Sequence, residues 1–253
     1  MISVCMAAYN GEKYIEEQVK SILPQLGEND ELIVSDDGSD DKTLEILESF
    51  NDRRIKIFHH NRSEVKIPFY LSSKTADNFY FAARNFENVL AKAQGDYIFL
   101  SDQDDVWLPD KIEKTIPYLN EDILVISDAW IVDENMEKQR KLSEYTNYKS
   151  GFWKNIIIRG APYGCLCAFT KNIKNFFLPI PKNILTHDFW LSLISELQFS
   201  SAYIPEPLVL YRRHSNTVSK ANVSRNSIFF IIRYRIFLLF EALKRYFLRH
   251  KCR

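Results

Sequence analysis

The sequence predicts an α/β fold whose sheet is flanked by helices, and three observations indicate it. The first sixty residues alternate short apolar runs with helical patterns, short loops connect them, and two polar clusters directly follow apolar runs. The order strand–helix–strand–helix–strand is typical of a parallel sheet covered by helices. Ligands of such sheets bind at the carboxyl ends of the strands, which is where both polar clusters fall.

The expected elements follow from the spacing of apolar residues. Apolar runs predict strands at 2–7, 31–35, 55–58, 97–100 and 123–126, with further strands near Ala168 and Leu208. Helical spacing predicts helices over 15–23, 44–50, 79–90 and 188–197, with a further helix after Pro109. The stretch from His60 to Asn78 lacks periodicity and is expected to be an irregular loop. Beyond residue 123 the pattern becomes mixed, so a mixed sheet is expected.

Charge is distributed unevenly along a chain that is neutral overall. The 253 residues include 33 Lys and Arg and 33 Asp and Glu. From Arg212 to the end there are eleven basic residues and one acidic residue, a balance of +10 that leaves −10 for residues 1–211. An acidic body with a basic tail suggests that the tail meets an anionic surface. The overall neutrality and the scattered aromatic residues argue against nucleic-acid binding by the body.

The four cysteines, Cys5, Cys165, Cys167 and Cys252, form neither a disulfide framework nor a CxxC pair, so a reducing compartment is expected. Cys165 and Cys167 are two apart in an apolar stretch, which favours strand residues on one face over metal ligands. Polar residues from Asn10 onward interrupt the first apolar run too early for a signal peptide. No uncharged stretch approaches the about 20 residues of a membrane span. A cytoplasmic location is therefore expected.

Three acidic residues, Asp102, Asp104 and Asp105, follow the apolar run at 97–100. Alternate side chains of an extended segment face the same way, so Asp102 and Asp104 are expected on one side and Asp105 on the other. Oxygen ligands at the end of a strand suit Mg²⁺ or Mn²⁺, which also bind substrate phosphates. Such a cation would neutralise the charge that develops on a departing diphosphate. The alternative is a solvated turn or a cap for the next helix.

Asp36 and Asp37 follow the run at 31–35 in the same way. A buried carboxylate there could accept a hydrogen bond from the N3–H group of uracil or thymine, which cytosine lacks. UDP- or dTDP-linked donors would then be selected over CDP-linked ones. The alternative is a capping and helix-dipole role ahead of Leu44.

Other common sites are excluded by missing motifs. The chain has no GxGxxG after the first strand, no GxxxxGK[ST] and no zinc-ligand spacing. A calcium-binding hand is a poor rival because Trp107 occupies its glycine position and Val106 its preceding ligand position. A phosphatase with an aspartyl nucleophile usually shows the motif Asp-x-Asp-x-Thr, and neither Val106 nor Trp107 can supply its threonine.

Three segments together resemble the family 2 glycosyltransferases. They are ISVCMAAYNG at residues 2–11, SDDGS at 35–39, and GDYI at 95–98 leading to SDQDDVW at 101–107. The DQDDVW form, with HDFW downstream at 187–190, resembles the bacterial branch that includes rhamnosyltransferases of surface polysaccharide assembly. The resemblance is strong over about residues 1–120 and moderate over 160–215. It implies a GT-A-like nucleotide-binding mixed sheet flanked by helices, and inversion at the anomeric carbon.

The resemblance also implies roles for residues of the donor side. Ala7 and Tyr9 would line the base pocket and Asp37 would contact the base. The family often has Thr or Ser where Ala7 stands, so that hydroxyl contact is lost here. Arg84 lies where some members place a basic residue near the base.

The cation site is implied by the same family pattern. Asp102 would approach the ribose or the cation, Mg²⁺ or Mn²⁺, and Asp104 would be its principal ligand. The segment 211–214 resembles the family's closing segment. In it, Arg213 or Arg212 would bind the diphosphate, and His214 would complete the coordination of the cation.

The second half is implied to carry the acceptor site. Segment 162–165, with Gly164, resembles the family's segment beneath the donor sugar and acceptor. The HDFW motif resembles the one that bears the catalytic base, which implies Asp188 as the base and places Trp190 on the acceptor side. His187 would be a supporting residue. The alternative for Asp188 is that it only stabilises the first turn of its helix behind Thr186.

The C-terminal segment is interpreted from periodicity alone. An apolar stripe recurs at intervals of three or four, at Phe229, Ile232, Ile236, Leu239, Leu243 and Phe247. At about 100° per residue the basic residues fall on the remaining side: Arg233, Arg235, Lys244, Arg245, Arg249 and Lys251. This pattern is typical of an amphipathic helix in a membrane interface. The alternative is a helix packed on the catalytic domain.

The sequence thus predicts a GT-A-like domain over residues 1–224 and a basic amphipathic helical tail over 225–253. The donor-binding half would span about 1–120 and the acceptor half about 121–224. The expected activity is inverting, cation-assisted transfer of a hexose from a UDP- or dTDP-sugar to a saccharide or lipid-linked saccharide. The protein would act as a peripheral protein on the inner face of the cell membrane, held by its tail on anionic lipid. The rivals are a non-catalytic nucleotide-sugar-binding relative and a metal-dependent nucleotidyl or phosphoryl transferase.

Overall fold

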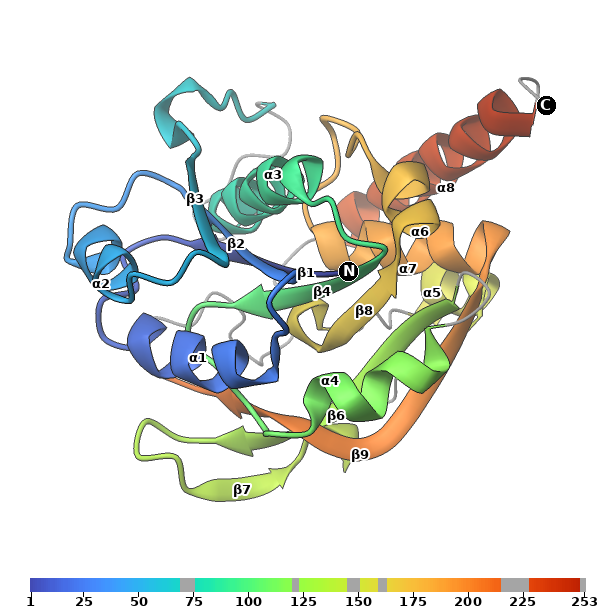
Figure 1. The fold of residues 1–253 in the computed structure, drawn as a ribbon. Coiled ribbons are helices and arrows are strands. Elements are labelled where there is room, and N and C mark those ends of the chain that lie inside the picture. The colour runs from blue at the N-terminus through green and yellow to red at the C-terminus, as the bar shows by residue number, and fades with distance from the viewer. Residues whose placement is uncertain (69–75, 120–122, 145–150, 159–162, 215–227, 251–253) are drawn as a thin grey trace.

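The protein is an α/β structure with a curled mixed sheet flanked by helices (Figure 1). The computed structural model describes residues 1–68, 76–119, 123–144, 151–158, 163–214 and 228–250. Its strands are β1 Ile2–Ala8, β2 Glu31–Asp36, β3 Ile55–His59, β4 Tyr97–Asp102, β5 Val106–Trp107, β6 Ile123–Val132, β7 Lys138–Lys141, β8 Cys167–Thr170 and β9 Ser200–Arg212. Its α-helices are α1 Ile15–Ile22, α2 Thr43–Ser49, α3 Ala76–Lys92, α4 Lys111–Thr115, α5 Phe152–Ile158, α6 Lys171–Phe177, α7 His187–Gln198 and α8 Ile228–His250.

The strand order explains why the sheet is mixed. In the described part of the chain the order is β3-β2-β1-β4-β8-β6-β9-β5, with β7 added on β6. The strands β3, β2, β1 and β4 are mutually parallel, as the alternation of the first sixty residues predicts. The strand β8 is antiparallel to both β4 and β6, and β6 is parallel to β9. The parallel half therefore gathers its carboxyl ends at one edge, and the other half closes against it.

The helices keep this edge in place by covering the two faces of the sheet. The helix α3 packs against β1 and β2 through fully buried Val89 and Leu90, and α1 buries Ile15, Val19 and Ile22 on the other side (Figure 1). The apolar residues at the centre of these strands, Val4 to Met6 in β1 and Leu32 to Val34 in β2, are fully buried, as in central parallel strands. The long β4–α4 connection and the ends of β1 and β2 are thereby fixed relative to one another.

Several expectations about elements need correction. The structure adds the strands β5 and β7 and the helices α5 and α6, for which the sequence pattern gave no assignment. Strand β6 continues to Val132, beyond the apolar run at 123–126, because it pairs along its length with β9. A short 3₁₀ helix, Arg62–Glu64, interrupts the expected irregular loop. The expected boundary at residue 224 and Pro162 lie outside the described residues.

The C-terminal helix α8 has one buried face and one exposed apolar face, and the buried face agrees with the interpretation as a helix packed on the domain. Leu238 and Ala242 are fully buried, so the helix packs on the domain, beside α7. Arg245 points inward and donates to the carbonyl oxygens of Phe176 and Leu178, each at 2.8 Å, so its expected place on the basic outer face is wrong. The opposite face exposes a row of large apolar side chains: Ile232, Ile236, Phe240, Leu243 and Phe247.

This row is called the apolar stripe below. It contains Phe240 in place of Leu239, which is half-buried, because the helix is turned toward the domain through Leu238 and Ala242. Exposed Arg233 and Lys244 lie along one side of it at about 100° per residue. The side chains of Phe229 and Arg249, and Lys251 as a whole, lie outside the described residues.

Gly95, at the turn before β4, gives a test of the sheet's packing. A Cβ atom there would lie 2.6 Å from the backbone nitrogen of Ser3 and 2.9 Å from the carbonyl carbon of Ile2, and backbone atoms cannot move aside cheaply. Gly95→Ala should therefore lower the free energy of unfolding by about 1–3 kcal/mol or more. Urea denaturation measures this. The matched control is Gly27→Ala, whose Cβ would meet only Asp30 Oδ2 at 3.3 Å. Equal stability of the two variants would contradict the packing described.

Candidate functional site

The carboxyl ends of β1, β2 and β4 meet at one edge of the sheet. Ala7 lies opposite Ser35 of β2 on one side and Asp102 of β4 on the other. The loops that follow these strands carry Tyr9, Asp37 and the acidic residues after Asp102. Two polar clusters that are 65 residues apart in the sequence are therefore neighbours across a single central strand.

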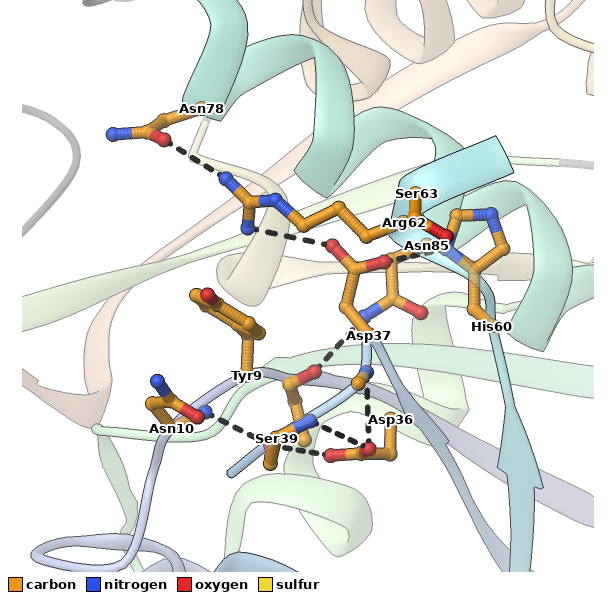
Figure 2. Close-up of polar contacts among 12 residues, drawn as sticks. Tyr9, Asn10, Asp36, Asp37, Ser39, His60, Arg62, Ser63, Asn78 and Asn85 are labelled. Atoms are coloured by element: carbon orange, nitrogen blue, oxygen red, sulfur yellow. Dashed lines mark hydrogen bonds and ion pairs between the residues drawn. The ribbon is translucent and has the colours of Figure 1, made fainter. Parts of the chain in front are cut away.

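Asp37 is buried at this edge with two basic partners (Figure 2). Only 2% of its side chain is exposed. His60 donates from Nδ1 to Asp37 Oδ1 at 2.6 Å, and Nη1 of Arg62 lies 3.6 Å from Oδ2. A buried carboxylate is stabilised only when such partners replace its water, so the segment after β3 is part of the site.

Arg62 connects Asp37 to two aromatic rings. Its guanidinium carbon lies 4.4 Å from the ring centre of Tyr9, and Nη2 donates to Asn78 Oδ1 at 3.1 Å (Figure 2). The same carbon lies 4.0 Å from the ring centre of Phe81. Cation–π contacts at these distances hold the guanidinium in place. Sequence reasoning missed both His60 and Arg62. The sequence feature that could have identified them is their position directly after β3, because β3 is parallel to β2 and ends at the same edge of the sheet as Asp37.

Arg84 does not lie beside Asp37. Its Nη1 donates to Glu87 at 2.8 Å and to the carbonyl oxygen of Ile180 at 2.9 Å. It therefore joins α3 to the segment before α7, because its place on the helix faces that segment. The basic partners of Asp37 among the described residues are His60 and Arg62, and a role of Arg84 near the base stays a prediction.

Asp36 builds the turn that presents Asp37. Its Oδ2 accepts hydrogen bonds from the backbone nitrogens of Gly38 at 3.1 Å and Ser39 at 3.0 Å. Gly38 has a φ of +81°, which favours glycine at this turn. Neither aspartate caps α2, whose N-cap is Lys42.

Gln103 ties the loop after β1 to the loop after β4. It accepts from the backbone nitrogen of Tyr9 and donates to the carbonyl oxygen of the same residue, both at 2.9 Å. A Cβ atom at Gly11 would lie 2.3 Å from Gln103 Oε1, so only glycine leaves room for this contact. Gln103 thereby fixes Tyr9 relative to the acidic cluster.

The acidic cluster does not follow the alternation expected of an extended segment. The chain bends at Gln103 and Asp104, directly after β4. As a result ligand atoms of Asp102, Asp105 and Cys165 lie within 4.8 Å of one another. Burial, and then the charges of Asp104 and Asp188, raise the pKa of Asp102 to about 7. The carboxyl groups of Asp102, Asp104 and Asp188 are therefore close enough to influence one another, and a bound cation would favour their charged forms.

Asp105 faces the interior, away from solvent. It is fully buried, and its Oδ1 accepts from the backbone nitrogen of Arg212 at 3.1 Å. Burial raises the pKa of Asp105 and that of the Cys165 thiol well above their usual values. Asp105 thus joins the β4–β5 loop to β9 through Arg212, and Cys165 lies beside it in the short 3₁₀ helix Gly164–Leu166 that precedes β8.

His214 meets Asp104 on the other side of the loop. Its Nε2 lies 2.8 Å from Asp104 Oδ2, and its ring centre lies 4.7 Å from that of Tyr14. The spacing of the two donor atoms is that of neighbouring ligands on one small cation. Asp104 and His214 therefore suit a Mg²⁺ or Mn²⁺ ion by donor chemistry and spacing. The ligand atom of Asp102, by contrast, lies within 4.8 Å of those of Asp105 and Cys165.

The two arginines before His214 have different surroundings. Arg212 is 4% exposed, donates from Nε to the carbonyl oxygen of Asp104 at 2.9 Å, and pairs with Glu17. Arg212 therefore fixes the backbone of the loop that carries Asp104. The backbone nitrogen of Arg213 donates to Val132, and its guanidinium lies 5.5 Å from the ring centre of Tyr211. Of the two, only Arg213 remains a candidate for binding phosphate.

Asp188 enters the site from α7. It lies near enough to Asp102 to contribute to that residue's raised pKa. Its Oδ1 accepts from the backbone nitrogen of Phe189 at 2.7 Å, within the first turn of α7. Thr186 is the N-cap residue but makes no side-chain capping hydrogen bond. Asp188 thus contacts the first turn of its helix, as the alternative proposes, and also lies close enough to influence Asp102.

His187 packs under the same region. Its ring stacks on Phe86 with ring centres 4.0 Å apart. Burial lowers the pKa of His187, so the ring is neutral at pH 7. A Cβ atom at Gly164 would lie 2.6 Å from His187 Nε2, so glycine is required for this close approach. Gly164 therefore belongs to the site through His187.

The segment that leads into α7 is held by side chains from neighbouring helices. Tyr80 donates to the carbonyl oxygen of Lys182, and Tyr234 of α8 accepts from the backbone nitrogen of Leu185 at 2.9 Å. Trp190 is fully buried and donates to the carbonyl oxygen of Phe177 at 3.1 Å. Trp190 is therefore a core residue that braces this segment, and its expected place beside the acceptor needs correction.

Comparison with known proteins agrees with this geometry. The model of the family described as "Glycosyl transferase family 2" matches residues 3–67 and 74–177. The dTDP-rhamnosyl transferase RfbG of Shigella flexneri is 30% identical over 87% of this chain and 75% of its own length.

Solved structures share the fold at lower identity. S. aureus TarS 1-349 in complex with UDP-GlcNAc matches 97% of this chain and 72% of its own, with a TM-score of 0.59 and 18% identity. In another structure of TarS 1-349 the match spans 60% of that chain's length. Glucosyl-3-phosphoglycerate synthase from Mycobacterium tuberculosis, in complex with Mn²⁺, UDP and glucosyl-3-phosphoglycerate, matches 96% of this chain and 79% of its own, with a TM-score of 0.54 and 19% identity. The chain belongs to glycosyl transferase family 2 and is a glycosyltransferase.

Proposed function

We propose that the protein transfers a hexose from a UDP- or dTDP-sugar to a saccharide acceptor, with inversion and with the help of Mg²⁺ or Mn²⁺. The observation that carries this proposal is the meeting of three groups at one sheet edge. Asp37 follows β2, the pair Asp104–His214 involves the loop after β4, and Asp188 of α7 lies close enough to Asp102 to help raise its pKa. These three groups would meet the base, the diphosphate and the sugar of a nucleotide sugar.

Asp37 would select the base of the donor. Each carboxylate oxygen can accept more than one hydrogen bond, so contacts with His60 and Arg62 leave capacity for the N3–H group of uracil or thymine. Ala7 and Tyr9 would line the same pocket. The UDP-GlcNAc complex of TarS and the dTDP-rhamnosyl transferase name of RfbG support these two donor classes.

The residues at the centre would bind the diphosphate. Asp102, Asp104 and His214 would hold the divalent cation, and Arg213 would contact a phosphate oxygen. When bound, the cation supplies positive charge to the diphosphate as it leaves. The Mn²⁺ and UDP in the mycobacterial synthase support this assignment.

Asp188 would act as the general base. The acceptor hydroxyl oxygen attacks the anomeric carbon from the side opposite the diphosphate, and its proton passes to an Asp188 carboxylate oxygen. The new bond joins that oxygen to the anomeric carbon, while the bond from the anomeric carbon to the diphosphate oxygen breaks. The electron pair leaves with the nucleoside diphosphate. Gly164 and His187 would shape the sugar side of this site.

The acceptor is proposed to be a lipid-linked saccharide of surface polysaccharide synthesis, reached from the cytoplasmic face of the cell membrane. No helix in the described part of the chain is long and apolar enough to cross a bilayer. The apolar stripe of α8 would instead lie in the interface of anionic lipid, with Arg233 and Lys244 meeting the headgroups. Exposed apolar rows of this kind commonly mark membrane or protein contacts.

Replacing the base tests the activity directly. Asp188→Asn keeps the shape of the side chain and removes the proton acceptor, so transfer should fall by about 10²–10⁴-fold while donor binding is retained. Release of UDP or dTDP measures transfer, and thermal stabilisation by the donor measures binding. A variant that keeps more than about a tenth of the rate would sink the assignment.

Cation dependence should reside in Asp104. Asp104→Ala should lower turnover by about a hundredfold or more without unfolding the protein, because the residue serves the site and is not part of the core. Nucleotide release with Mn²⁺ and after chelation measures the effect. The cation proposal fails if activity survives exhaustive chelation or this substitution.

Tyr234 tests whether α8 positions the base. Tyr234→Phe removes only the hydroxyl that accepts from Leu185, three residues before Asp188. Loss of this hydrogen bond should reduce kcat several-fold and leave the KM for the donor unchanged, with about 1 kcal/mol lost in stability. Tyr246→Phe on the same helix is the control. Equal kcat for both variants would show that the contact has no positioning role.

Membrane binding should depend on the apolar stripe. The double substitution Leu243→Ser and Phe247→Ser removes apolar area that would insert in lipid, so sedimentation with phosphatidylglycerol vesicles should drop strongly. Raising the salt concentration should weaken binding of the unchanged protein as well. If the protein ignores vesicles, or the double variant binds equally well, the tail is only a packing helix.

A further inference from the structure

A groove runs along the first half of α8, beside the segment that precedes α7. Its volume is about 440 Å³, within the range of roughly 300–1,000 Å³ typical of small-molecule sites. Its walls are mostly apolar, and two polar side chains join them. The lining residues are Asn183, Phe230, Arg233, Tyr234, Ile236, Phe237 and Phe240.

The walls of the groove suit a hydrocarbon chain. The side chains of Ile236 and Phe240 are 64% and 61% exposed, so much apolar surface there faces water in the protein alone. Covering it would be favourable by about 25 cal/mol per Å² of apolar area. Exposed Arg233 stands at the groove, and the only acid of α8, Glu241, is absent from its lining. Apolar walls with one guanidinium fit a chain that ends in a phosphate.

The groove also reaches the catalytic segment. Tyr234 lines it, and the hydroxyl of the same residue accepts a hydrogen bond from the backbone nitrogen of Leu185. Asn183, another lining residue, lies in the same segment, five residues before Asp188. A molecule in the groove would therefore have its head group next to the residues that carry the base.

We propose that this groove binds the hydrocarbon chain of the lipid-linked acceptor, and that Arg233 binds the phosphate joining chain and sugar. The proposal rests on the proposed function for the identity of the acceptor. It differs from docking of the helix on a bilayer, because Leu243 and Phe247 belong to the apolar stripe but lie outside the groove. One lipid chain would leave the bilayer beside the stripe and enter the protein.

Binding of farnesyl phosphate, a single short chain with one phosphate, tests the site without donor or transfer. The full chain is titrated below the micelle concentration, and the rise in unfolding temperature gives the Kd. Saturable binding is expected, with farnesol binding more weakly because it lacks the charge. No saturable binding would overturn the proposal. Transfer to a water-soluble saccharide, measured separately, would then still report on the proposed function.

Matched variants separate the groove from the bilayer surface. Ile236→Ser and Leu243→Ser both alter exposed residues of the apolar stripe, so both should fold and weaken vesicle binding. Only Ile236→Ser should weaken farnesyl phosphate binding, by several-fold. Arg233→Gln should weaken it about tenfold, as expected for a lost hydrogen bond to a charged group, while Lys244→Gln should not. The proposal fails if Leu243→Ser lowers the affinity for farnesyl phosphate as much as Ile236→Ser does. It also fails if Lys244→Gln lowers that affinity as much as Arg233→Gln does. In either case the ligand lies on the apolar stripe and not in the groove.

Discussion

The site depends on one electrostatic constraint, the gathering of carboxylates at the carboxyl edge of a parallel sheet. Asp102, Asp104 and Asp105 follow one strand, and Asp188 reaches the same place from α7. Burial, and then repulsion from the charges of Asp104 and Asp188, raises the pKa of Asp102 to about 7. The fold relieves this repulsion in two ways. It buries Asp105 in a form that favours the proton, and it pairs Asp104 with His214. A divalent cation would be the natural counter-charge for the carboxylates that remain.

Residues distant in the sequence hold this arrangement together. Arg212 binds the carbonyl oxygen of Asp104 from β9, and Gln103 ties the same loop to Tyr9. The helices α3 and α8 fix the segment before α7 through Tyr80 and Tyr234. Helix α8 thus supports, on its inner face, the segment that leads to the proposed base. Its outer face carries the apolar stripe, so this supporting contact and the proposed membrane surface lie on opposite faces of one helix.

The sequence predicts those features that local pattern determines. Strands β1 to β4, the helices between them and the polar clusters at their ends follow from apolar periodicity. The pairing of Asp104 with His214 agrees with the family resemblance, although the residues are 110 apart. Features set by tertiary contact were not predictable. Nothing local shows that Arg62, and not Arg84, meets Asp37, or that Trp190 is turned into the core. The alternation rule failed at 102–105 because the chain bends there, and periodicity could not tell that α8 would turn Arg245 inward.

The central claim is that this edge binds a nucleoside diphosphate together with a divalent cation. The most direct measurement is the unfolding temperature of the unmodified protein with UDP alone, with Mn²⁺ alone and with both. Because the carboxylates repel the diphosphate until a cation neutralises them, the account predicts that the two together stabilise the protein by more than the sum of their separate effects. Stabilisation by UDP that is equally large in the presence of a chelator would contradict it.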